Sequence, residues 1–236
     1  MALNCYLAMT AAEFATAEAL PEFPAWMACH FSSYGTGLSN LPAGLPKGAI
    51  IILNDRMPIC GHDPNQISKE LNTLYELYQP DSFLLDFQRP QNPETAALAQ
   101  TLCHTLPCPV GITESYAQEL DCPVFLSPPP LYVPLAEYLA PWKNREVWLE
   151  AALDSQIICV TPEGSQLQDK AFEKPVAPLF EDNHLHCHYH ITLEEDMASF
   201  FLWRKEEDLL DLLNEAEALH ITRAIGLYQQ LKNVMR

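Results

Sequence analysis

Basic residues are scarce in this sequence of 236 residues. Thirteen lysines and arginines face 31 aspartates and glutamates, which gives a formal net charge of −18 at pH 7. A field of this sign repels phosphate backbones and anionic lipid headgroups, and no basic stripe interrupts it. The charge balance therefore excludes nucleic acids and membrane surfaces as main partners.

Long apolar runs, glycine-rich loops and closely spaced cysteine pairs are also missing. No apolar stretch approaches the roughly 18 residues that can cross a bilayer, and the N-terminus lacks the pattern of a signal peptide. The eight cysteines include no Cys-x-x-Cys pair, which is typical of free thiols in a reducing compartment. The segment Gly35-Thr36-Gly37 lacks the third glycine of a dinucleotide loop. We therefore expect a cytoplasmic protein without a cofactor.

The sequence does contain a regular alternation of short apolar runs and helical stretches. The run 49–53 is apolar at every position, as in parallel strands that are covered by helices on both faces. The pattern favours a (β/α)8 TIM-type barrel formed by a single domain, 1–236, over an open doubly wound sheet with fewer strands. The expected strands are 4–9, 26–31, 49–53, 82–87, 109–113, 123–127, 146–150 and 223–228, and the expected helices are 11–20, 64–78, 93–106, 135–139 and 205–219.

The alternation fails between the seventh and eighth expected strands. Three strand-like runs follow one another there without helices, and the Pro- and charge-rich residues 162–183 between two of them are expected to form a loop. We predict a small antiparallel insertion that spans residues 154–204 within the barrel domain. Its three expected strands are 156–160, 185–193 and 199–203.

The insertion contains a histidine-rich strand at residues 184–190. Its four histidines share one face of the strand, and the opposite face is continuously apolar. Neighbouring imidazoles on a strand can bind zinc. We interpret the histidines instead as the solvated side of the insertion, and we predict no metal site. The histidines are His184, His186, His188 and His190.

Polar side chains follow most of the expected barrel strands. Barrel enzymes place their sites at the C-terminal ends of the strands, so we predict the functional site at this rim. Alternation along the fourth strand directs Asp86 and Gln88 toward the barrel mouth. The rim residues are His30, Ser32 and Tyr34 after the second strand, Asn54, Asp55 and Arg56 after the third, Asp86, Gln88 and Arg89 after the fourth, Glu114 after the fifth, Ser127 after the sixth, Glu150 after the seventh and Tyr228 after the eighth.

The segment 81–88, Asp-Ser-Phe-Leu-Leu-Asp-Phe-Gln, resembles the strand-four signature of glycoside hydrolase family 18, the chitinase-like barrels. That signature is Asp-Gly-x-Asp-x-Asp-x-Glu, and its final Glu is the catalytic acid. Asp81 and Asp86 match the first and last Asp, whereas Leu84 replaces the middle Asp and Gln88 replaces the Glu. The family also carries an insertion after strand seven and an aromatic residue at the end of strand eight, where this chain has Tyr228.

The resemblance implies a barrel that binds a saccharide or a glycosylated small molecule. An amide at position 88 cannot donate the proton that a leaving oxygen requires, so we expect weak or absent hydrolysis. Lectin-like members of the family also lose the Glu and keep sugar binding. Asp86 would orient the ligand, Gln88 would bond to it, and Arg89 would hold Asp86 or contact an acidic group. The other expected ligand residues are Asp81, Asn54, Asp55 and the aromatics Tyr34, Tyr132 and Tyr228.

Two alternatives remain open at this stage. The first is an active barrel hydrolase that uses Asp86 together with Glu150 or Glu114. The spacing of the two carboxylates, roughly 5 Å or 6.5–9.5 Å, would then decide between retention and inversion. The second is a non-enzymatic scaffold whose antiparallel insertion is a docking surface. The sequence does not indicate an oligomeric state.

Overall fold

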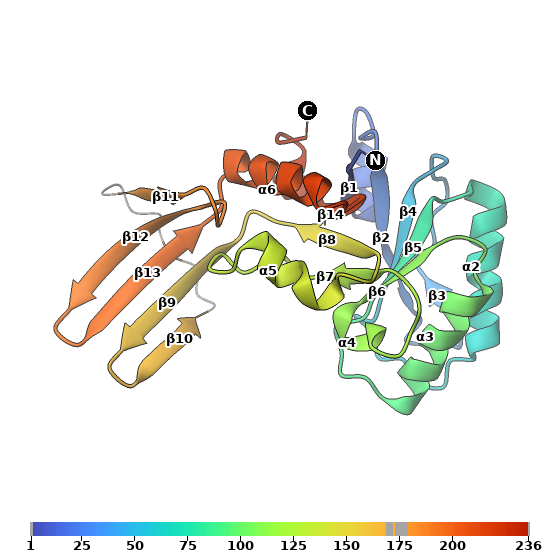
Figure 1. Ribbon diagram of the computed structural model, residues 1–236. Helices are drawn as coiled ribbons and strands as arrows, with labels where there is room; N and C mark the ends of the chain where they lie inside the picture. The colour runs from blue at the N-terminus through green and yellow to red at the C-terminus, as the bar shows by residue number, and fades with distance from the viewer. Residues whose placement is uncertain (1, 169–171, 173–178, 236) are drawn as a thin grey trace.

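Eight parallel strands close into a ring in the computed structural model, which describes residues 2–168, 172 and 179–235 (Figure 1). The first strand pairs with both the second and the last strand, so the ring has no open edge. The strands are β1 (Asn4–Met9), β2 (Pro24–Phe31), β4 (Ile50–Asn54), β5 (Ser82–Asp86), β6 (Val110–Thr113), β7 (Val124–Leu126), β8 (Val147–Ala151) and β14 (Arg223–Leu227). The prediction of a TIM-type barrel is confirmed. A short strand, β3 (Leu38–Ser39), pairs antiparallel with β2 outside this ring.

The two long helices after β4 and β5 begin at capping residues that the sequence makes evident. The side chains of Asp63 and Asn92 accept hydrogen bonds from the first backbone amides, and a proline occupies the first turn of each helix. Among the described residues, no helix is long and apolar enough to cross a membrane. The helices are α1 (Ala11–Thr16), α2 (Pro64–Tyr78), α3 (Pro93–Thr105), α4 (Glu114–Ala117), α5 (Leu135–Leu139), α6 (Glu206–Ala218) and α7 (Tyr228–Leu231), with a 3-10 turn at Ala140–Trp142.

Helix α1 is shorter than the expected helix over residues 11–20. Ala17 already has an extended backbone, and the helix ends at Thr16. None of the six helical residues is buried, so packing against the barrel does not extend the helix. Pro21 also disfavours helical geometry in the residue before it.

Apolar side chains form one layer inside the barrel and a second layer between the strands and the helices. Trp148 is fully buried and fills the barrel interior. A Cβ atom at Gly111 would lie 2.3 Å from the Trp148 ring, so the absence of a side chain there makes room for the indole. The inner layer consists of Tyr6, Ala8, Ala25, Ile50, Ile52, Leu84, Phe125, Trp148 and Ile225.

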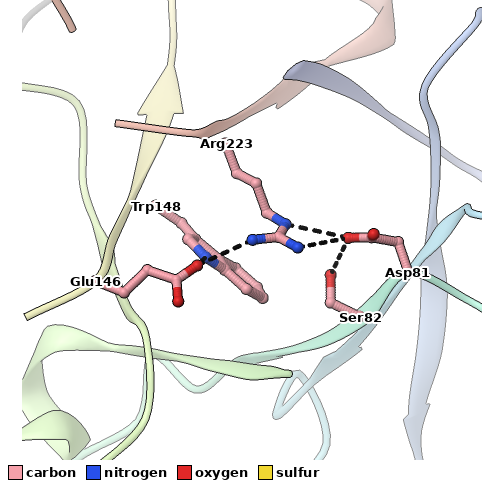
Figure 2. Close-up of polar contacts among 5 residues, drawn as sticks. All are labelled: Asp81, Ser82, Glu146, Trp148 and Arg223. Carbon is pink, nitrogen blue, oxygen red and sulfur yellow. Dashed lines mark hydrogen bonds and ion pairs between the residues drawn. The ribbon is translucent and has the colours of Figure 1, made fainter. Parts of the chain in front are cut away.

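A polar network closes the barrel at the N-terminal ends of its strands, and Figure 2 shows its geometry. The Arg223 guanidinium donates to Asp81 Oδ2 at 3.0 and 3.1 Å and to Glu146 Oε1 at 2.9 Å. Its central carbon lies 5.0 Å from the centroid of the Trp148 ring, whose Nε1 also donates to Glu146. These charge-assisted bonds tie the starts of β5, β8 and β14 together.

The predicted insertion is present as a five-stranded antiparallel sheet that projects away from the barrel (Figure 1). Its strands lie in the order β10-β9-β13-β12-β11. Two of them, β10 and β11, fall within residues 162–183, so the expectation of a loop there is wrong for those positions. Residues 169–171 and 173–178 of that expected loop lie outside the described residues. The strands are β9 (Ser155–Thr161), β10 (Gly164–Gln168), β11 (Phe180–Asp182), β12 (Cys187–Glu194) and β13 (Met197–Trp203).

The expected face of four histidines is only partly present, because β12 begins at Cys187 and both His184 and His186 lie in the turn before it. His188 is 7% exposed, and its Nδ1 forms a 2.9 Å hydrogen bond with Asp208 of α6. His186 Nε2 lies 2.5 Å from a carboxylate oxygen of Glu215 on the same helix. The acidic residues of α6 therefore partner two of the histidines, and the interpretation of a fully solvated face is wrong for His186 and His188. The contact between α6 and these residues joins segments far apart in the chain, and no local pattern indicates it.

Candidate functional site

A cavity of about 620 Å³ opens at the C-terminal ends of the barrel strands. Its floor is formed by inner-layer residues such as Leu84, Phe125 and Ile225. Five polar residues of the predicted site line its wall together: Asn54, Asp55, Asp86, Gln88 and Glu150. The rim therefore brings Asp86, at the end of β5, and Glu150, in β8, to one open cavity, as expected for a barrel.

Asp86 and Gln88 form a hydrogen-bonded pair on this wall. The Gln88 Nε2 group donates to Asp86 Oδ1 at 2.6 Å. Burial raises the pKa of the Asp86 carboxyl, the nearby charge of Asp55 raises it further, and the bond from Gln88 opposes both effects. The pair therefore presents one carboxylate and one amide to the cavity.

Glu150 lies in β8 and has the most strongly perturbed carboxyl group at the cavity. Burial raises its pKa to about 7, with further contributions from the charges of Asp86 and Asp154. No described residue forms a hydrogen bond or an ion pair with its carboxyl group, and Arg56 on the same cavity does not pair with it. A partly protonated carboxyl with free bonding capacity can donate a proton or a hydrogen bond to a ligand near neutral pH.

Asp55 and Arg89 fix the loops beneath Gln88. Asp55 is 2% exposed and accepts the backbone N–H groups of Gln88 and Arg89 at 2.9 and 2.8 Å. The Arg89 guanidinium donates in return to the backbone carbonyls of Asp55 and Arg56. Within the described residues it forms no bond to Asp86, so its observed partners differ from the expected one. Both side chains position the loop that carries Gln88.

Asn54 braces an irregularity in β2 next to the cavity. The pairing of β2 with β4 shifts register between Trp26 and Cys29. The Asn54 Nδ2 group donates to the carbonyls of Met27 and Cys29 at 3.1 and 3.0 Å across this shift. Asn54 lines the cavity, but its amide hydrogens are used to hold the bulged strand in place.

Several predicted site residues lie away from the cavity. Asp81 is at the opposite end of the barrel, where it binds Arg223 (Figure 2). Tyr34 is 98% exposed, and Tyr228 packs on the outer layer with Lys232 above its ring. Glu114 and Tyr132 are exposed and are not among the residues that line the cavity. These five positions followed or preceded a strand in the sequence, but their side chains point elsewhere.

The cavity also includes residues that the sequence did not single out as ligand contacts. Thr10, Met27 and Phe125 line it, and so do His30 and Leu227. His30 is a rim residue whose ring bonds to the Phe31 carbonyl and to Asn40. Thr10 directly follows β1, so its position after a strand could have predicted that it lies at the barrel mouth. The inward direction of Met27 and Phe125 depends on strand register, which the sequence alone does not give.

No protein-family model matches this sequence, and no curated protein matches it. Solved structures match in fold. The glycoside hydrolase family 18 N-acetylglucosaminidase of Paenibacillus barengoltzii aligns over 99% of this chain and 98% of its own, with a TM-score of 0.60 and 8% identity. The family 18 chitinase of Cycas revoluta aligns over 98% and 97%, with a TM-score of 0.57 and 10% identity.

The spore cortex-lytic enzyme SleL of Bacillus cereus is a third similar structure. It aligns over 95% of this chain and 70% of its own, with a TM-score of 0.56 and 10% identity. At these identities the likeness shows the fold, and the expected resemblance to the family 18 barrel is confirmed at that level. The chain therefore shares the barrel fold of these three structures.

Proposed function

We propose that the cavity at the barrel mouth binds an oligosaccharide that contains N-acetylglucosamine, with weak or no hydrolysis. The observation that carries this proposal is the hydrogen-bonded pair of Asp86 and Gln88 on the wall of a 620 Å³ cavity. A cavity of this size can take one or more sugar rings, and its mixed apolar floor and polar wall suit a saccharide.

The position of Gln88 supports binding over catalysis. Gln88 occupies the position of the catalytic Glu in the family 18 strand-four signature that residues 81–88 resemble. An amide has no acidic proton to transfer. The Cycas revoluta chitinase structure is that of a double mutant in which one substitution replaces a glutamate by glutamine, and it contains (GlcNAc)4. That chitinase, which has the same fold, therefore binds the tetrasaccharide with a glutamine in place of one of its glutamates.

Calorimetric titration of the purified protein with (GlcNAc)4 tests the proposal. We expect saturable one-site binding, and we expect cellotetraose, which lacks the acetamido groups, to bind more weakly. Absence of heat with (GlcNAc)4 and with a broad panel of other oligosaccharides would refute saccharide binding.

The raised pKa of Glu150 supports glycoside hydrolysis as a second candidate function. Its pKa of about 7 keeps part of the carboxyl protonated at neutral pH, and it shares the cavity with Asp86. In this alternative Glu150 donates the proton to the leaving oxygen. Turnover of 4-methylumbelliferyl chitobioside by the wild type, lost in Glu150→Gln while (GlcNAc)4 binding persists, is the expected result. A wild type without turnover rejects the alternative.

A further inference from the structure

Three metal-ligating side chains meet where the insertion contacts α6. The pairing of β11 with β12 sets Glu181 directly opposite His188, and Asp208 lies in the first turn of α6. One nitrogen or carboxylate oxygen from each residue lies within 4.8 Å of one from each of the others. Among the described residues, this is the one group of three possible metal-ligating side chains. None of its members lines the barrel cavity.

Two of the three side chains are held in place before any ligand binds. His188 is buried, its Nδ1 lies 2.9 Å from Asp208 Oδ2, and its ring stacks on Trp203 with centroids 6.2 Å apart. Asp208 is 5% exposed and accepts the backbone N–H of Lys205 at 2.7 Å. Glu181 is exposed, so its side chain has room to turn toward the other two residues. Its exposure also lets an ion from solvent reach the three residues.

One imidazole nitrogen and two carboxylates form a donor set that suits Zn²⁺. Zinc sites with an open position use three protein ligands and one water, with metal–ligand distances of about 2.0–2.2 Å. The ligand atoms are close enough to reach this geometry through a modest shift of the exposed Glu181 side chain. Binding would replace the hydrogen bond between His188 Nδ1 and Asp208 Oδ2 by a bond from each of these atoms to the metal.

The surrounding charges also favour a cation. Arg204 is 2% exposed and lies within electrostatic range of Asp208 and Asp154. Two carboxylates therefore act on this one guanidinium, and Glu181 adds a further negative charge beside Asp208. The chain as a whole carries a formal net charge of −18. A divalent ion would therefore reduce repulsion among the acidic groups rather than add to it.

We propose that Glu181, His188 and Asp208 bind a divalent transition-metal ion of the Zn²⁺ class. The ion joins the short edge strand β11 to β12 and to the start of α6. In this position the ion fastens the outer part of the insertion to α6. The site does not depend on the saccharide-binding proposal, because no residue is shared between the two.

Titration of the metal-free full-length protein with Zn²⁺, in competition with a chelator, tests the site. We expect one equivalent to bind and to raise Tm, and we expect Co²⁺ to give the visible absorption of a four-coordinate site. Glu181→Gln removes an exposed ligand without disturbing the buried pair, so it should fold normally and bind at least tenfold more weakly.

Two matched variants control for adventitious binding to the insertion. His184→Gln removes an exposed histidine of the same segment, and Glu163→Gln removes an exposed carboxylate of the β9–β10 turn. Both should retain wild-type affinity. Binding without a defined stoichiometry, or equal affinity in Glu181→Gln and the wild type, would overturn the proposal.

Discussion

The side-chain amide of Gln88 donates a 2.6 Å hydrogen bond to the carboxylate of Asp86. The bond orients the carboxylate within the cavity and favours its ionised form. A glutamate in place of Gln88 would occupy nearly the same volume and would carry an acidic proton. In the proposed binding site Asp86 therefore orients the ligand, whereas position 88 offers no acidic proton.

Gln88→Glu should create or increase glycosidase activity. A carboxyl beside Asp86 keeps its proton more readily than an isolated one, because two like charges repel each other. We expect a gain of about 10- to 100-fold in the hydrolysis of 4-methylumbelliferyl chitobioside, near the lower end of general acid effects because Leu84 still replaces the middle Asp of the signature.

Gln91→Glu is the matched control for this gain. It makes the same chemical change in the following loop, at an exposed residue that does not line the barrel cavity. Its turnover should equal that of the wild type. A folded Gln88→Glu protein that binds (GlcNAc)4 but shows no gain would indicate that Glu150, or no residue at all, supplies the proton.

Asp86→Asn should weaken (GlcNAc)4 binding by about tenfold or more. The substitution removes the charge and replaces one of the two acceptor oxygens by a donor, so the bond from Gln88 and an acceptor oxygen for the ligand can no longer both be kept. Asp81→Asn should leave the affinity unchanged and lower the unfolding midpoint, because Asp81 pairs with Arg223 at the far end of the barrel. Calorimetric titration with parallel urea unfolding measures both effects. Equal affinity losses in the two variants would contradict the assignment.

The contrast between Asp81 and Asp86 also shows what the sequence could predict. Asp81 directly precedes β5 and Asp86 is its last residue, so only Asp86 can reach the mouth of the barrel. The apolar runs were sufficient to place the eight barrel strands, and the capping signals placed the starts of α2 and α3, because local patterning decides these elements. The exposed strand β10 and the short strand β11 lack such a pattern and were missed. The partners of Asp55, Arg89 and His188 come from distant segments, and single-sequence patterning carries no information on such contacts.

The stability of the protein should fall as the pH rises from about 4.5 to 7 because of Glu150. The pKa of its carboxyl is about 7 in the folded protein and near 4.5 when unfolded. The folded state therefore holds the proton over this range, and stability is lost as the pH passes through the folded value. The loss is at most about 3 kcal/mol, reduced by partial solvent access.

Glu150→Gln should remove this part of the pH dependence. Urea unfolding at pH 5 and pH 8 gives the free energy of unfolding for both proteins, and the wild type should lose more stability between the two values than the variant. Glu114→Gln, a change at an exposed carboxylate after β6, should behave like the wild type. Equal pH dependence in all three proteins would show that Glu150 titrates normally.

Asn54→Ala should destabilise the protein by about 1–3 kcal/mol, because it leaves the carbonyls of Met27 and Cys29 without their donor at the register shift of β2. Met27 and His30 line the cavity, so a relaxed β2 should also weaken (GlcNAc)4 binding. Asn72→Ala removes an amide that bonds only to Ser68 within α2, and it should cost less stability with no change in affinity. Urea unfolding and calorimetric titration separate the two effects. An Asn54→Ala protein with wild-type stability and affinity would show that the bulge holds its shape without this side chain.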